Sequence, residues 1–421
     1  MPDSTPPSRV CNRLSSGIVS KRLCYLLIHI GKGIRNIILR KTAHSRPLSA
    51  EVGGALGDLG TFVPYTLGAI SVAGMSPVGV LGGFGLLYLA SGLFYRLPIP
   101  VQPMKAVAAV MLTSGLTPGA IAASGLLIGV ALLALAATGV IARLARAVPQ
   151  TVSTGLQLGL GISLGWLSLE MMAENAWLGA LMVIMLACML RVPGLPATLV
   201  ALVVAVIIGR ALAPEQVWPD LRPTLGLPSV VLPGLDDLAH ALRVTVLPQL
   251  ALTVTNAIIV TAVMAGELFG NRARRVTPVN LALTSGVANL CLAPLGAMPM
   301  CHGAGGLAAH YRFGARSGVA PVLMGVALLI LASTFSNTAI GMLALMPLAA
   351  VGALLLFSAI ELAWSRRLVD ARPECLPVIG ITAGATVLAD PLWGLVAGAV
   401  TEWLAGRFAS SSRGATDDRT S

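Results

Sequence analysis

Charged residues are scarce in this chain, and their scarcity excludes a water-soluble fold. Asp, Glu, Lys and Arg make up 11% of the 421 residues, whereas they make up about a quarter of soluble proteins. Hydrophobic residues account for 56%, and the mean hydropathy is +0.85. Apolar runs of the length that crosses a bilayer core, roughly 20 residues, recur almost from end to end. We therefore expect an integral membrane protein with little room for a soluble domain.

The apolar runs also lack the alternating polar positions that are typical of membrane β-barrels. Because backbone polar groups in lipid must pair with one another, the spans must be either helices or a closed barrel. Uninterrupted runs of Leu, Ala, Val and Gly favour helices, and the 46 glycines allow the close helix contacts that are common in lipid. The expected fold class is all-α integral membrane.

Paired cysteine spacings and a nucleotide-binding motif are missing as well. The six cysteines have no spacing typical of a disulfide framework or a zinc site, so we interpret them as reduced thiols. The sequence contains no GxxxxGK[ST] motif, which argues against ATP hydrolysis by this chain. We expect no metal and no other cofactor.

The formal net charge of +11 is distributed in a way that argues against binding nucleic acid. Nine of the 28 Lys and Arg residues precede Glu51, and most others lie at the ends of apolar runs, as they do in cytoplasmic loops. With an even number of spans, the positive-inside rule places both termini in the cytoplasm. The expected location is the cell (inner) membrane.

Hydrophobic runs bounded by Gly, Pro and charged residues predict about fourteen transmembrane segments. We expect them at 52–73, 76–95, 103–115, 118–142, 150–169, 175–191, 195–212, 247–265, 276–297, 303–314, 317–335, 338–363, 374–388 and 391–408.

Two of these runs, 103–115 and 303–314, are too short to cross the membrane. A helix of 13 residues is about 20 Å long, against about 30 Å for the bilayer core. The two short runs occupy matching positions in the two halves of the chain. Matching interrupted segments indicate a transporter with inverted repeats and a site near the membrane midplane.

A long polar connection with five prolines, residues 213–246, separates the two hydrophobic halves. We expect a first inverted repeat at 50–212, an extracytoplasmic loop at 213–246, a second repeat at 247–408, and a short polar tail at 409–421. Seven spans in each repeat, an odd number, would invert the second repeat relative to the first.

The first 49 residues, 1–49, form a basic segment that we expect to be cytoplasmic and partly amphipathic or disordered. Within it, residues 21–41 interleave apolar residues with Lys and Arg, as in an amphipathic interfacial helix. A cleaved targeting segment and a misassigned start remain open as alternatives.

The two short runs carry residues suited to binding an anion. Proline suits the first turn of a helix, so we expect Pro103 and Pro299 to begin two half-helices. A helix start carries about +0.5 charge and free N–H groups, so two facing starts and the ammonium of Lys105 would supply about +2 and balance a dianion. The alternative for Lys105 is an anchor that snorkels to the cytoplasmic interface.

Asp58 is an acidic residue within the first apolar run, where a carboxylate is costly and usually functional. The alternative is a capping role at a break among the surrounding glycines. Loading a dianion near Asp58 would favour its protonation, which would couple transport to protons.

Gln249, Thr253 and Asn256 share one helix face in a later run, where they supply neutral hydrogen-bonding groups. Polar contacts between helices are the alternative for these three residues. Cys301 and His302 are adjacent but lack a second pair of metal ligands. For His302 we expect a donor to an anion or a histidine whose hydrogen bonds are satisfied at a helix break.

Several strings of the sequence together resemble one known family. They are GDLGT at 57–61, PVQPMK at 100–105, LPQL at 247–250 with TVTN at 253–256, and AMPMCHGAGGL at 297–307 followed by YRFG at 311–314. These strings closely resemble the plant and bacterial molybdate transporter family, which is related to the SulP sulfate permeases. The resemblance extends from about residue 50 to residue 408.

The resemblance implies a 7+7 inverted repeat in which core helices move against a gate domain and hold the anion between the two half-helices. It implies a secondary active transporter that imports molybdate. Proton coupling is an expectation from the residues themselves, with Asp58 as the coupling group and His302 as the next candidate. The candidate substrate-binding residues are Asp58, Thr61, Gln102, Pro103, Met104, Lys105, Gln249, Thr253, Asn256, Met300, Cys301, His302, Gly303, Ala304 and Gly305.

Several alternatives remain open at this point. Sulfate, tungstate or another tetrahedral oxyanion could replace molybdate as the substrate. An intramembrane enzyme that uses Cys301 and His302, or a channel, would be different classes of protein. The expected partners are the oxyanion and the lipid bilayer, and the sequence does not decide whether the chain works alone or as a homodimer.

Overall fold

The structure is a computed structural model that describes residues 48–141, 143, 149–192, 197–215, 218–219, 223 and 226–417. The amphipathic helix expected at 21–41 lies outside these residues.

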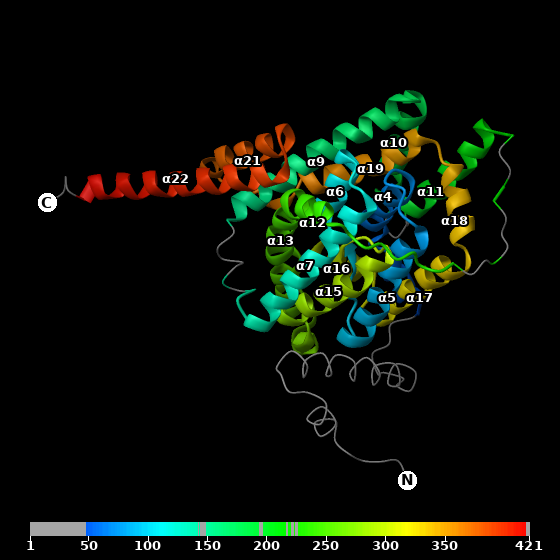
Figure 1. The fold of residues 1–421 in the computed structure, drawn as a ribbon, viewed down its shortest axis with the longest axis horizontal. Coiled ribbons are helices and arrows are strands. Elements are labelled where there is room, and N and C mark those ends of the chain that lie inside the picture. The colour runs from blue at the N-terminus through cyan, green and yellow to red at the C-terminus, as the bar shows by residue number, and fades with distance from the viewer. Residues whose placement is uncertain are drawn as a thin grey trace, which may run out of the picture.

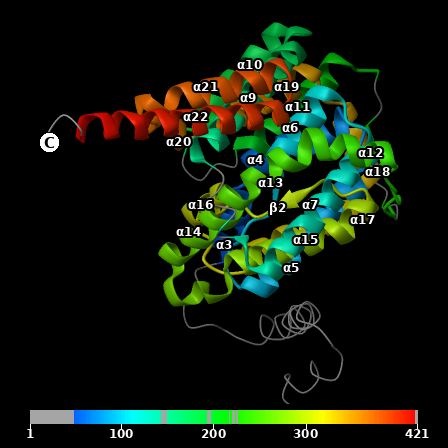
Figure 2. The same ribbon diagram turned by 60° about the vertical axis from the view of Figure 1, so that its left-hand side comes forward.

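The described helices pack as two bundles (Figures 1 and 2). The larger bundle contains α3 (Leu48–Leu56), α4 (Leu59–Ser71), α5 (Pro77–Tyr95), α6 (Lys105–Ser114), α7 (Pro118–Thr138), α12 (Leu235–Ala241), α13 (Leu247–Leu252), α14 (Thr261–Phe269), α15 (Pro278–Leu292), α16 (Ala304–Arg312), α17 (Val319–Thr334) and α18 (Ser336–Ala344). The smaller bundle contains α9 (Gln150–Ala173), α10 (Ala176–Met189), α11 (Ala197–Leu212), α19 (Leu348–Ala363), α20 (Arg366–Val369), α21 (Leu376–Leu388) and α22 (Pro391–Asp417).

Glycine allows the backbones of α5 and α17 to touch within the larger bundle. A Cβ atom added to Gly92 would lie 2.5 Å from the carbonyl oxygen of Gly318, and one added to Gly318 would lie 2.1 Å from the carbonyl oxygen of Gly92. Both distances are far below van der Waals contact. Small residues that bring backbones together in this way are the usual basis of helix packing in lipid.

We predict that Gly92→Ala destabilises the larger bundle by about 1–3 kcal/mol, because overpacking of this size forces the backbones apart. Gly82→Ala on the same helix is the matched control, since a Cβ there would lie 3.7 Å from the Ala332 Cβ, an ordinary contact. Thermal unfolding in detergent should show a lower melting temperature for Gly92→Ala only. Equal melting temperatures for the two variants would contradict this account of the α5–α17 contact.

Five helical segments of the described chain are long and apolar enough to cross a membrane, and a sixth is counted if the bent pair α17 and α18 forms one span. The five are Pro77–Tyr95, Pro118–Thr138, Gln150–Ala173, Leu235–Arg275 and Pro278–Leu295. Other predicted spans are shorter apolar helices, among them α6, α10, α11 and α19.

Breaks in the helices are one reason why the structure has fewer long spans among its described residues than the fourteen that the sequence predicts. The single span expected at 338–363 is wrong, because α18 ends at Ala344 and α19 begins at Leu348, directly after Pro347. A proline disfavours helical geometry in the residue before it, so the helix stops there. The run at 52–73 is likewise divided at Gly57 and Asp58 into α3 and α4.

Two further helices extend beyond their predicted limits. The helical segment that leads into the second half begins at Leu235, inside the connection expected at 213–246. It continues through two π-helical segments, η1 (Leu242–Val246) and η2 (Thr253–Val260). The last helix, α22, continues to Asp417, into the residues expected as a polar tail.

A two-stranded antiparallel pairing joins the two halves at the centre of the larger bundle. β1 (Gln102–Pro103) pairs with β2 (Met300–Cys301), and the Met104 N–H donates to the Pro299 carbonyl at 3.0 Å. Helix α6 follows β1 and α16 follows β2, so the pairing brings the first turns of the two short helices close together.

The expected positions of the two prolines are therefore wrong. Helix α6 begins at Lys105 and α16 at Ala304, whereas Pro103 lies in β1 and Pro299 precedes β2. The fixed φ of proline is also compatible with extended backbone. Both prolines thus belong to the paired segment in front of the helices.

Candidate functional site

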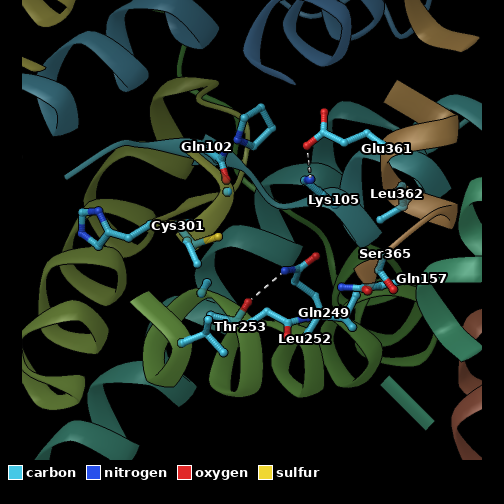
Figure 3. A pocket seen from close by; sticks show the side chains of 18 of the residues that line it. Gln102, Lys105, Gln157, Gln249, Leu252, Thr253, Cys301, Glu361, Leu362 and Ser365 are labelled. Atoms are coloured by element: carbon cyan, nitrogen blue, oxygen red, sulfur yellow. Dashed lines mark hydrogen bonds and ion pairs between the residues drawn. The ribbon is translucent and has the colours of Figure 1, made fainter. Parts of the chain in front are cut away.

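A cavity of 340 Å³ lies where the starts of α6 and α16 meet the π-helical segment η2 and the end of α19 (Figure 3). It is lined by Gln102, Pro103, Lys105, Gln157, Gln249, Leu252, Thr253, Asn256, Ala257, Val260, Cys301, His302, Gly303, Ala304, Gly305, Glu361, Leu362, Ser365 and Arg367. Four of the predicted site residues, Asp58, Thr61, Met104 and Met300, lie outside this lining. The cavity thus combines both halves of the chain and both bundles.

The start of α6 is already occupied by a side chain. The Gln249 Oε1 atom accepts hydrogen bonds from the N–H groups of Ala106 at 2.8 Å and Val107 at 3.4 Å. The Gln249 Nε2 atom donates to the Thr253 hydroxyl at 2.8 Å. Gln249 therefore caps α6, and those two N–H groups are not free for an anion as the sequence led us to expect.

The start of α16 is open. Among the described residues, no acceptor is bonded to the N–H groups of Ala304, Gly305 or Gly306, which are the first three of the helix. A Cβ atom added to Gly305 would meet nothing within 4 Å, so the backbone there borders empty space. Free N–H groups and the positive end of the helix dipole make this start suitable for binding an anion.

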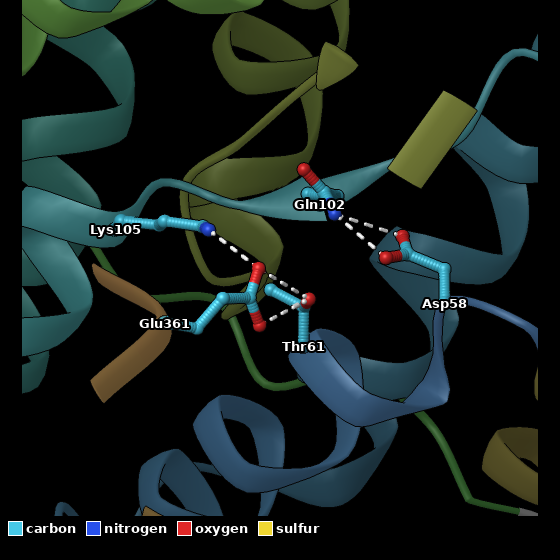
Figure 4. Close-up of polar contacts among 5 residues, drawn as sticks. All are labelled: Asp58, Thr61, Gln102, Lys105 and Glu361. Atoms are coloured by element: carbon cyan, nitrogen blue, oxygen red, sulfur yellow. Dashed lines mark hydrogen bonds and ion pairs between the residues drawn. The ribbon is translucent and has the colours of Figure 1, made fainter. Parts of the chain in front are cut away.

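An ion pair in the wall of the cavity joins the larger bundle to the smaller one (Figure 4). The Lys105 Nζ atom lies 3.2 Å from Glu361 Oε1, and the two side chains are 27% and 46% exposed. The Thr61 hydroxyl lies 3.2 Å from Glu361 Oε1 and 3.0 Å from Oε2, to which it donates. Sequence reasoning missed Glu361, although it is an acidic residue near the end of an apolar run, the same signal that identified Asp58.

Asp58 lies one side chain behind the cavity wall and is 2% exposed. The Gln102 Nε2 atom donates to Asp58 Oδ1 at 2.7 Å and to Oδ2 at 3.0 Å. Asp58 occupies the N-cap position of α4, but its side chain makes no capping hydrogen bond. Its carboxylate therefore orients Gln102, which lines the cavity, instead of closing the break in the helix.

His302 has partners on both ring nitrogens. Its Nδ1 atom lies 2.9 Å from the Pro100 carbonyl, which can only accept, so Nδ1 carries the proton. Its Nε2 atom lies 2.8 Å from the Thr284 hydroxyl, which can then donate to it. This matches the alternative of a histidine with satisfied hydrogen bonds at a helix break, while the adjacent Cys301 borders the cavity.

Arg367 adds a second cation to the cavity wall, from α20 of the smaller bundle. Its guanidinium donates to the side-chain oxygen of Asn256 in the larger bundle. In the sequence Arg367 is one of the basic residues at the ends of apolar runs, and with the adjacent Arg366 it has the pattern of an ordinary cytoplasmic loop. Only the packing of the two bundles places it beside the other residues of the site.

Comparisons with known proteins agree on a family and a fold. Residues 50–164 and 242–362 match the family model described as "Molybdate transporter of MFS superfamily". Molybdate transporter 2 of Arabidopsis thaliana is 30% identical over 386 residues, covering 80% of this chain and 82% of that protein. Molybdate transporter 1 of the same plant is 28% identical over 383 residues, covering 79% and 83%.

Two solved structures of transporters have a similar fold. The murine Solute Carrier 26 family member A9 anion transporter, in the inward-facing state, matches with a TM-score of 0.65 and 14% identity over 90% of this chain and 71% of its own. The transmembrane domain of a cyanobacterium bicarbonate transporter, BicA, matches with a TM-score of 0.62 and 17% identity over 84% and 98%. The described part of the chain therefore has a SulP-type transmembrane fold that is built almost entirely of helices.

Proposed function

This chain belongs to the molybdate transporter family, and we propose that it imports molybdate across a membrane as a secondary active transporter. As a member of this family it is an integral membrane protein and a transporter, not an enzyme. The observation that carries the proposal is the cavity between the two bundles, where the open start of α16 lies beside the ammonium of Lys105.

The charges around the cavity suit a small oxyanion with two negative charges. Lys105 and Arg367 each contribute one positive charge, and the start of α16 contributes about half a charge. Glu361 offsets one of them, which leaves a net positive site. The open N–H groups of α16 can donate to the oxygens of a tetrahedral anion, while Gln102 and Cys301 border the same space.

We infer that the chain is organised as two inverted repeats of seven segments, at 50–212 and 247–408, with the connection at 213–246 on the outer side. The N-terminal ends of α6 and α16 lie close together, and each half of the chain contributes one of these short helices to the same cavity. This placement supports the proposed repeats. In this proposal the larger bundle is the moving core and the smaller bundle is the gate, in the cell membrane, with both termini in the cytoplasm.

Binding of molybdate to the detergent-purified chain tests the substrate. In a calorimetric titration we expect saturable binding of molybdate, competition by tungstate, and weaker competition by sulfate. If sulfate were the substrate, sulfate would bind more tightly than molybdate, and if tungstate were the substrate, tungstate would bind most tightly. Failure of all three oxyanions to bind would contradict the proposed function.

We propose Asp58 as the proton-coupling group, since a dianion in the cavity would lie one side chain away from this buried carboxylate. Like charges in a medium of low dielectric repel, so substrate loading would favour protonation of Asp58. Uptake should then accelerate at acidic external pH. We predict that Asp58→Asn retains exchange of molybdate across liposomes and loses accumulation.

The rival account is that Asp58 only orients Gln102, in which case Asn, whose amide oxygen can still accept the Gln102 hydrogen bond, should behave like the native residue. Molybdate-driven proton flux into liposomes distinguishes the two. Normal flux and accumulation in Asp58→Asn would exclude Asp58 as the coupling group and make His302 the next candidate.

A further inference from the structure

We propose that the Glu361 carboxylate pairs with Lys105 while the site is empty, and that the transported oxyanion takes its place as the partner of Lys105. Displacement would break a polar link between the two bundles, so that substrate loading frees the gate to move against the core. This inference rests on the proposed function, because it assigns a role to a residue of the same cavity.

The contacts of Glu361 link the two bundles beside the cavity. Glu361 belongs to α19, whereas both of its partners belong to the larger bundle (Figure 4). The Lys105 ammonium lies 3.2 Å from one carboxylate oxygen, and the Thr61 hydroxyl lies within 3.2 Å of both oxygens. Separation of α19 from α4 and from the start of α6 must therefore break these bonds or replace them with others.

A bound oxyanion is such a replacement. Lys105 and Glu361 both border the cavity, so an anion that reaches the open start of α16 also reaches the ammonium. At equal distance a dianion attracts the ammonium about twice as strongly as a single carboxylate does. The same dianion repels the Glu361 carboxylate. Keeping both negative groups close to Lys105 is therefore unfavourable, and the carboxylate should move away.

The local structure allows Glu361 to withdraw. Helix α19 ends two residues later, at Ala363, and the cavity leaves nearly half of the Glu361 side chain exposed. Arg367, from the following helix, keeps a cation on the same wall of the cavity. Withdrawal of Glu361 therefore leaves an anion-attracting surface behind.

The variant Glu361→Gln tests this role, since it keeps the shape of the side chain and one acceptor oxygen for Thr61 and removes the negative charge. Without a competing anion, molybdate should bind about 3- to 30-fold more tightly in calorimetry, a range that corresponds to the loss of one screened charge. Spin labels on α4 and α19 should show the molybdate-loaded separation of the bundles even without molybdate. In the native chain that separation should change only when molybdate is added.

Two further variants complete the test. Glu361→Asp shortens the side chain by one methylene, which weakens its ion pair with Lys105, so this variant should also bind molybdate more tightly. It provides an independent test if the Gln variant folds poorly. Glu402→Gln is the matched control, because Glu402 accepts a hydrogen bond from the Thr151 hydroxyl at 2.6 Å within the smaller bundle. It should leave affinity and bundle separation unchanged.

Weaker molybdate binding in Glu361→Gln and Glu361→Asp would overturn the inference and make Glu361 a residue that positions Lys105 for the anion. An unchanged affinity, with no change in bundle separation, would also overturn it. These outcomes differ from failure of the proposed function, in which the native chain itself would bind no oxyanion.

Discussion

Replacement of Lys105 by Met is expected to weaken molybdate binding by about 100-fold or more, with a folded yield close to that of the native chain. The change removes a charged donor, worth about 1.5–3 kcal/mol, and leaves the Glu361 carboxylate uncompensated beside a dianion. Each 1.4 kcal/mol is a tenfold change in affinity. The ion pair itself is partly exposed, so its loss should cost the fold only about 0–1 kcal/mol.

Calorimetric titration of the purified variant measures this loss, and the double variant Lys105→Met with Glu361→Gln provides its control. Because the second change removes the uncompensated carboxylate, the double variant should recover part of the affinity. An unchanged affinity in Lys105→Met would show that Lys105 is an interfacial anchor, the alternative that the sequence left open.

Gly305→Val is expected to abolish detectable molybdate binding while the protein remains folded. A Cβ atom at this position would meet no neighbouring atom within 4 Å, so the new side chain starts in open space, and it would occupy the space in front of the open N–H groups of α16. Gly303→Val differs, because its Cβ would lie 1.8 Å from the Gln102 Oε1 atom and would disturb the wall of the cavity itself.

The matched control for Gly305→Val is Gly384→Val in α21, where a Cβ would also meet nothing within 4 Å. Both variants should elute as folded protein in size-exclusion chromatography, and only the control should bind molybdate. Normal binding by Gly305→Val would mean that the anion does not approach the start of α16.

Local signals in the sequence predicted the membrane class and much of the candidate cavity. Lys105 and Gly305 were recognised because each lies in an interrupted apolar run, where short-range chemistry is informative. The resemblance to the molybdate transporter family was likewise found in short contiguous strings of the sequence, which need no knowledge of the fold. The structure brings these segments to one cavity through the pairing of β1 with β2.

Residues whose role depends on distant contacts could not be predicted in this way. Glu361 pairs with a lysine 256 positions earlier in the chain, and Arg367 bonds with a residue 111 positions earlier. Gln249 was expected to offer its amide to the substrate, but its carbonyl caps α6, a helix more than 130 residues away in the sequence. Such contacts depend on how helices that are distant in the sequence pack, both within the larger bundle and between the two bundles, and no local pattern encodes this packing.

Uptake of labelled molybdate into proteoliposomes tests the central claim most directly. With a proton gradient directed inward, the purified chain should accumulate molybdate above the external concentration, with saturation and with stronger competition by tungstate than by sulfate. Collapse of the gradient should abolish accumulation while exchange continues. Absence of saturable molybdate uptake by a folded, correctly reconstituted chain would contradict the account.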